Sequence, residues 1–118
     1  MNDQKSFDNP AQDIGYFIFM DRDEETILYA KGLLDDTING YLILTNKKLF
    51  FFFWSNINRD KKFIASHPYL VSAELKKGTF SSTISISSKK ETFSISRMKN
   101  PEAALFIKKL EEIILKNN

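Results

Sequence analysis

Alternating apolar and polar positions predict seven short strands between residues 26 and 96. Turn-forming residues, such as the pairs at Asp35-Asp36 and Lys77-Gly78, separate these strands. The predicted strands are Thr26–Leu34, Tyr41–Thr45, Leu49–Trp54, Lys61–Ala65, Tyr69–Lys76, Thr79–Ser88 and Glu91–Ser96. In the sixth strand Phe80, Ile84 and Ile86 alternate with serine and threonine, which predicts one buried and one solvated face. In the fifth, Val71, Ala73 and Leu75 share a face in the same way.

The hairpin Gly40–Trp54 is the stretch around which the chain is organised. Asn46 in its turn tolerates the backbone angles that a short hairpin needs. The second arm is apolar on both faces, with Leu49, Phe51 and Phe53 on one side and Phe50, Phe52 and Trp54 on the other. Such a strand must be covered twice. We expect the barrel interior to cover the first face, and the segment Tyr16–Met20 or a second subunit to cover the other.

Helical spacing predicts an amphipathic C-terminal helix over Pro101–Lys116. Its apolar positions are Ala103, Phe106, Ile107, Leu110, Ile113 and Ile114. Asn100 is a favourable N-cap, and proline fits the first helical position. A second, short helix is predicted over Pro10–Met20, although a strand through Tyr16–Met20 fits the same residues.

Seven antiparallel strands followed by one helix is the element order of the pleckstrin-homology (PH) superfold. The stretch Gly40–Phe51, with Thr45-Asn46-Lys47-Lys48 at its turn, resembles the hairpin of GRAM and bacterial PH-like domains. The segment Ala65–Gly78 is similar to the part that follows in those families. The resemblance covers residues 25 to 116, and it divides the chain into an N-terminal extension, 1–24, and a PH-like domain, 25–118.

This resemblance implies a mainly β fold: a seven-stranded antiparallel barrel or sandwich, capped by the terminal helix. It also implies binding rather than catalysis, although a fold alone does not determine function. In PH-type domains inositol phosphates are usually held at the open end opposite the helix, where the first strand-to-strand loop supplies basic residues. Here that loop, residues 35–40, carries two acids and no base, which argues against tight phosphoinositide binding.

Composition removes several classes of function. The chain of 118 residues has no cysteine, so it has neither disulfides nor a cysteine nucleophile. No apolar run approaches the ~20 residues of a membrane span, and the first residues do not resemble a signal peptide. We therefore expect a cytoplasmic protein, with peripheral contact to a membrane left open.

Catalytic and metal-binding patterns are not found in the sequence. The single histidine, His67, stands between serine and proline in an expected turn, and we assign it a structural or incidental role. The acidic stretch Asp21–Glu25 lacks the order of an EF-hand loop, and we expect a solvated turn. With only four glycines there is no phosphate loop. We expect no enzyme, cofactor, metal or small-molecule substrate.

Three binding hypotheses remain. The net charge of +2 is unevenly spread: residues 1–40 carry −6 and residues 41–118 carry +8. The first hypothesis is binding to another protein or to itself through Tyr16, Phe17, Phe19, Phe50, Phe52 and Trp54. The second is weak binding to anionic lipid through Arg59, Lys61, Lys62, Lys89 and Lys90. The third is binding of single-stranded nucleic acid through Trp54, Lys61 and Lys62, against which the small net charge argues.

Overall fold

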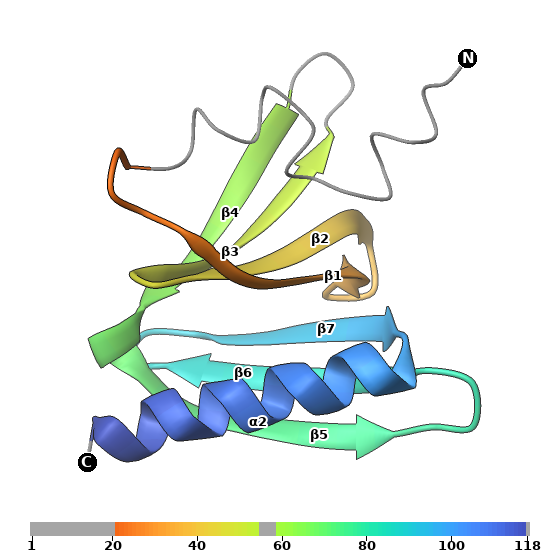
Figure 1. The fold of residues 1–118 in the computed structure, drawn as a ribbon. Helices are drawn as coiled ribbons and strands as arrows, with labels where there is room; N and C mark the ends of the chain where they lie inside the picture. Colours follow the sequence, from red (N-terminus) through yellow and green to blue (C-terminus); the bar gives the residue numbers. More distant parts are fainter. Residues whose placement is uncertain (1–20, 55–58, 118) are drawn as a thin grey trace.

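The computed structural model describes residues 21–54 and 59–117, which form one antiparallel sheet and a C-terminal helix (Figure 1). The strands are β1 (Thr26–Leu34), β2 (Ile38–Thr45), β3 (Lys48–Trp54), β4 (Arg59–Ser66), β5 (Leu70–Lys77), β6 (Ser82–Ser88) and β7 (Thr92–Met98). A short 3-10 helix, η3 (His67–Tyr69), joins β4 to β5, and the long helix is α2 (Asn100–Lys116). The predicted mainly β fold with seven strands and a terminal helix is confirmed. The helix predicted over Pro10–Met20 lies outside the described residues.

The strand order is β4-β3-β2-β1-β7-β6-β5, so that β4 and β5 form the two edges. Figure 1 shows β1–β4 and β5–β7 as two groups of strands that diverge from each other. The pairing of β1 with β7 joins the groups through Leu33 opposite Ser96 and Leu34 opposite Ile95. Helix α2 lies along the second group and contacts β5 and β6.

The main core lies where α2 meets the interior of the sheet. Ala103, Phe106 and Leu110 are the buried residues of α2, and they follow the spacing that the sequence predicted. Their neighbours in the core include Leu42, Leu44, Leu49 and Phe51 of the β2–β3 hairpin. The hairpin register pairs Leu42 with Phe51, which places both side chains on the core face.

A second apolar cluster lies on the other face of the hairpin. Its members are Tyr41, Ile43, Phe50 and Phe52, and all four are buried. The prediction that β3 is covered on both faces is therefore confirmed. The four side chains are buried within a single copy of the chain, so no second subunit is needed to cover them. Tyr16–Met20 lies outside the described residues, so its role as the cover stays a prediction.

The turn between β5 and β6 differs from the prediction. Phe80 was expected to point inward from the sixth strand, but β6 begins at Ser82 and Phe80 is 92% exposed. The reason is the backbone hydrogen bond from Gly78 N to Ser81 O (2.9 Å), which closes a tight turn with Phe80 in it. Ile84 and Ile86 are buried as expected.

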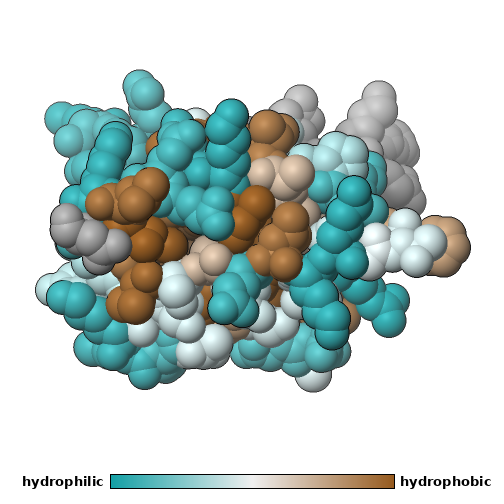
Figure 2. Space-filling view, turned by 90° about the horizontal axis from the view of Figure 1, so that it is seen from below, coloured by the Kyte–Doolittle hydropathy of each residue, from teal (hydrophilic) through white to brown (hydrophobic). Residues whose placement is uncertain are grey.

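Strand β5 is also more exposed than its alternation predicted. Ala73 packs against the main core, but Val71 is 49% and Leu75 37% exposed. A register irregularity between Leu70 and Ser72 removes Val71 from the regular alternation. Leu75 lies on an edge strand, which has a neighbouring strand on one side among the described elements. Figure 2 looks onto this side of the molecule.

Asn100 does not cap α2 as expected, because the helix already includes it and Lys99 takes the cap position. The Asn100 side chain instead accepts a hydrogen bond from Ser82 Oγ (2.5 Å) and donates one to Gly78 O (3.3 Å). It therefore joins the start of α2 to both ends of the β5–β6 turn.

Gly40 is the position in β2 where any side chain would disturb the hairpin. A Cβ atom there would lie 2.3 Å from Phe52 O and 2.7 Å from Phe51 Cε2. Because the first of these is a backbone atom, β2 and β3 must separate to admit it. We expect Gly40→Ala to lower the free energy of unfolding by about 1–3 kcal/mol, as overpacking does. Urea denaturation measures this, and an unchanged midpoint would contradict the close approach.

Candidate functional site

A pocket of about 520 Å³ lies where the end of β4, η3 and the β6–β7 turn meet. The described residues that line it are Ile64, Ala65, Ser66, Tyr69, Ser88, Lys89, Lys90 and Glu91. Ile64 and Ala65 are buried and provide an apolar wall, whereas Tyr69 is half exposed. Both lysines and Glu91 are exposed. The pocket thus combines an apolar wall with charged groups that solvent reaches.

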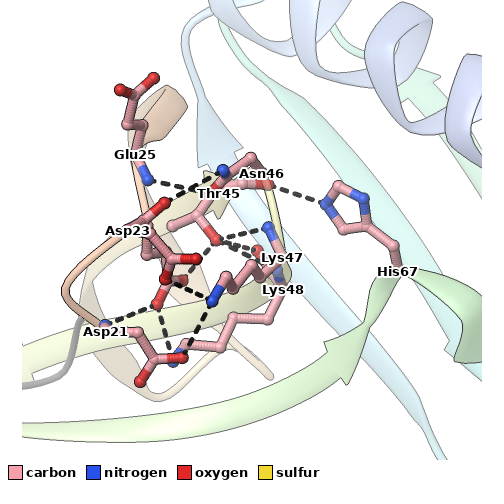
Figure 3. A network of polar contacts seen from close by, with 9 residues as sticks. Asp21, Asp23, Glu25, Thr45, Asn46, Lys47, Lys48 and His67 are labelled. Atoms are coloured by element: carbon pink, nitrogen blue, oxygen red, sulfur yellow. Dashed lines mark hydrogen bonds and ion pairs between the residues drawn. The ribbon is translucent and has the colours of Figure 1, made fainter.

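One side of the pocket is formed by Tyr69 of η3, the 3-10 helix that turns the chain from β4 into β5. Pro68 favours such a turn because its ring fixes one backbone angle and removes a donor. His67 ties η3 to the β2–β3 turn: its backbone N–H donates to Lys47 O (3.1 Å), and its ring Nε2 lies 2.7 Å from Thr45 O (Figure 3). Because a carbonyl oxygen only accepts, Nε2 is the donor. His67 therefore has a structural role, one of the two that the sequence analysis left open, and it positions Tyr69 through contacts with the hairpin turn.

The end of α2 holds η3 from the other side. The Asn117 side-chain amide donates to His67 O (2.6 Å) and to Leu70 O (3.2 Å). The two acceptors are the carbonyl groups of the first residue of the 3-10 helix and of the residue that follows it. The pocket wall is consequently attached both to the hairpin turn and to the C-terminal helix.

The second wall is the tight turn between β6 and β7. Ser88 N donates to Glu91 O (2.8 Å), and Ser88 Oγ accepts from the backbone N–H groups of Lys90 and Glu91 (both 3.2 Å). Lys89 N donates to Tyr69 O (3.1 Å), which brings this turn against η3. The Lys89 ammonium lies 5.4 Å from the centre of the Tyr69 ring, a cation–π distance. The turn therefore places two positive charges at the pocket.

A buried ion pair lies on the far side of His67, at the start of β1. Glu24 was expected in a solvated acidic turn, and this is wrong: its side chain is buried. The carboxylate accepts hydrogen bonds from Asp21 N (2.9 Å) and Thr45 Oγ1 (2.5 Å), and lies 3.1 Å from Lys48 Nζ. Burial raises the pKa of Glu24, but the backbone bond from Asp21 and the contacts with Thr45 and Lys48 outweigh it and lower that pKa below its ordinary value.

The rest of the acidic turn is exposed, as expected. Lys47 Nζ lies 2.6 Å from Asp23 Oδ1 and 3.6 Å from Asp21 Oδ2. The hydrogen bond from Lys47 lowers the pKa of the Asp23 carboxyl. Within residues 21–54 and 59–117, no group of three or more histidine, cysteine, aspartate or glutamate side chains is placed to hold a metal ion. We therefore interpret this network as a structural support for the hairpin turn and for η3.

Comparison with known proteins identifies the family. The family model of the bacterial PH domain matches residues 20–112, which is most of the chain. The chain belongs to the bacterial PH domain family. A search of curated proteins found no match. The resemblance to GRAM domains stays a prediction, as does the division of the chain into an N-terminal extension, 1–24, and a PH-like domain, 25–118.

PH-like domains are generally non-catalytic binding modules, and membership of this family suggests the same kind of role. In this bacterial PH domain the β1–β2 loop is an acidic turn in which Asp35 and Asp36 have positive φ values of 48° and 63°. Their carboxylates accept hydrogen bonds from Ser94 N (3.0 Å) and Ser96 Oγ (2.8 Å) of β7. Among the described helices, none is long and apolar enough to cross a membrane.

The five basic residues predicted to contact an anionic surface fall into two groups, one near each end of β4. Lys89 and Lys90 lie at the pocket with the last three residues of that strand. Arg59, Lys61 and Lys62 belong to its beginning, where the backbone of Lys61 pairs with Phe52. Their side chains lie outside the part that the structure describes, as does that of Trp54. A common basic surface and nucleic-acid binding through these residues therefore stay predictions.

The residues predicted for a protein-binding face are placed differently. Phe50 and Phe52 are 0% and 1% exposed, so their side chains are part of the molecule's interior. Tyr16, Phe17 and Phe19 lie outside the described residues, and their role stays a prediction. Sequence reasoning missed Tyr69 and Ser66, although His67-Pro68 between them marked the place where the strand pattern breaks.

Proposed function

We propose that this bacterial PH domain is a non-enzymatic binding module that holds a segment of another protein in the pocket beside η3. The observation that carries the proposal is the composition of this pocket, where a buried apolar wall meets two lysine side chains within about 520 Å³. Protein pockets that bind ligands commonly combine apolar walls with a few polar groups that fix orientation.

The chemistry of the pocket indicates what kind of segment would fit. Ile64, Ala65 and the Tyr69 ring accept an apolar side chain, because water is displaced from apolar surface on both partners. Lys89 and Lys90 favour a carboxylate beside that side chain. Glu91 at the same turn disfavours a second acid on its own side. The expected ligand is thus a short acidic segment with one large apolar residue.

The proposal is tested with peptides displayed on phage and selected on the full chain. We expect the recovered peptides to contain an aromatic or aliphatic residue next to aspartate or glutamate. A synthetic copy of a recovered peptide should bind Tyr69→Ala about tenfold more weakly, because an interface aromatic residue typically contributes more than 1 kcal/mol. Lys89→Ala with Lys90→Ala should weaken binding and reduce its salt dependence.

A matched control is the double change Lys99→Ala with Lys108→Ala, which removes two exposed lysines that do not line the pocket. This variant should bind the peptide as the natural chain does. Equal losses in both double variants would show attraction to overall charge and contradict recognition in the pocket. Failure to recover any peptide that depends on Tyr69 would contradict the proposal as well.

Weak attachment to an anionic membrane is the second candidate, because Lys89 and Lys90 are exposed beside the half-exposed Tyr69. Each basic residue near such a surface contributes about 1 kcal/mol, and salt screens the attraction. The two carboxylates of the β1–β2 loop repel a phosphorylated headgroup that approaches that loop. In liposome flotation we expect weak, salt-sensitive binding without preference among phosphoinositides. Salt-resistant binding that discriminates among headgroups would place lipid first.

A further inference from the structure

The exposed apolar side chains of the described residues are concentrated on one side of the molecule. Eight large apolar residues are exposed in the described part of the chain, and six of them belong to η3, β5, the β5–β6 turn or α2. They are Tyr69, Val71, Leu75, Phe80, Leu105 and Leu115. Figure 2 looks onto this side and shows apolar surface in separate areas among hydrophilic side chains. Separate apolar side chains are common on protein surfaces, so they favour a protein contact only together with a strand edge that a partner can pair with.

Strand β5 provides the backbone for such a contact. It pairs with β6 along one edge, and the sheet order gives it no further strand among the described elements. Gly78 N–H points toward β6, where it bonds to Ser81 O. Because backbone groups alternate between the two edges of a strand, the N–H and C=O groups of Leu75 and Lys77 point the other way. This is the outer edge, on which another strand can pair.

We propose that two copies of this chain pair antiparallel through the outer edges of β5, with Leu75 on the two-fold axis. In this register Glu74 of each copy lies opposite Lys76 of the other, so that the axis generates two equivalent ion pairs. Both side chains are exposed in the single copy and lie on the same face of β5. A symmetric dimer requires a self-complementary surface, and the sequence Glu74-Leu75-Lys76 provides it.

Neighbouring registers are less favourable. Moving the axis to Glu74 places the two Glu74 carboxylates opposite each other, which is repulsive. Moving it to Ala73 places Glu74 opposite Ser72 and brings the irregular backbone at Val71 into the ladder. The charges of β5 therefore select Leu75 for the axis.

The helix adds to the same interface. Residues that lie opposite each other in paired strands share a face, so the joined sheet carries both α2 helices on one side. Helix α2 packs along β5 in each copy. Leu75, which points to the helix side of β5 as Ala73 does, would then be covered by its counterpart. Edge pairing and apolar cover thus act together.

Sedimentation velocity of the full chain over a wide range of concentration tests this pairing. The natural chain should show a monomer–dimer equilibrium. Lys76→Glu replaces two attractive pairs by two repulsive ones and should weaken dimerisation about tenfold or more. Glu74→Lys should do the same. The double variant Glu74→Lys with Lys76→Glu restores opposite charges and should recover dimerisation to within about twofold.

Lys77→Glu is the matched control, because it makes the same change of net charge at the next residue, which lies opposite Ala73 in the proposed register. It should dimerise as the natural chain does. The changed residues are exposed, so circular dichroism should show the natural fold in each variant. A chain that remains monomeric at all concentrations would overturn the proposal, as would a dimer that the double variant fails to recover. The pocket beside η3 is untouched by these changes, so either outcome leaves the proposed function to its own test.

Discussion

Replacing Phe106 with alanine should lower the free energy of unfolding by about 3–5 kcal/mol, which is a large part of the stability of a small domain. The Phe106 side chain is 1% exposed and belongs to the main core between α2 and the sheet. Its removal loses apolar burial and leaves a cavity, because the backbone of the surrounding strands is held by hydrogen bonds and closes it incompletely. Urea denaturation followed by circular dichroism measures the change.

Leu105 supplies the control in the same helix. It precedes Phe106 in the chain but is 59% exposed. Leu105→Ala should change the free energy of unfolding by no more than about 0.5 kcal/mol, since alanine is also a good helix former. Leu110→Ala, at a position with 0% exposure, should cost about 2–5 kcal/mol. Similar effects at Leu105 and Phe106 would contradict the orientation of α2.

Replacing Glu24 with alanine is the second large effect, at about 2–4 kcal/mol. The change removes the partner of Lys48 Nζ, whose side chain is only 16% exposed, and the acceptor of the Thr45 hydroxyl. A buried charge that loses its partner is more costly than the pair itself is stabilising. The loss should be visible in the urea midpoint, and it should be larger than the loss for Thr45→Val, which keeps the ion pair.

The same carboxylate makes stability depend on acid pH. Its pKa in the folded chain lies below the ordinary value of 4.5, so the unfolded chain binds the proton more tightly. Stability from Glu24 is therefore complete above that ordinary value and is lost as pH falls through the lower folded pKa. The free energy of unfolding should fall less steeply with acidification in Glu24→Gln than in the natural chain. Equal slopes would contradict the lowered pKa.

Asp23 is the matched acid for this comparison. Its pKa is also lowered, by Lys47, but both groups are exposed and solvent screens their attraction. Asp23→Asn should leave the stability at neutral pH nearly unchanged. A loss as large as that of Glu24→Ala would show that the exposed pair, and not the buried one, holds the turn.

Local patterns predicted most of the fold. The range of β1, the two arms of the hairpin and the helix were predicted to within a few residues, because side chains alternate in strands and recur every third or fourth residue in helices. Both faces of Phe50–Phe52 were expected to be buried, and the reason was equally local. The predicted burial of Phe80 was wrong, because the alternation of apolar and polar residues continues through the turn in which Phe80 lies. The hydrogen bond between Gly78 and Ser81 closes that turn before β6 begins.

The sequence by itself therefore determined the elements, their apolar faces and the family to which they belong. Only the tertiary structure decided that Glu24 is buried, since its partners Thr45 and Lys48 lie more than twenty residues away in the chain. It also decided that Tyr69 and Lys89 meet at a pocket and that β5 is an edge. Periodicity reports which face of an element is apolar, but the neighbour of that face depends on how the sheet bends and closes, and long-range contacts set that geometry.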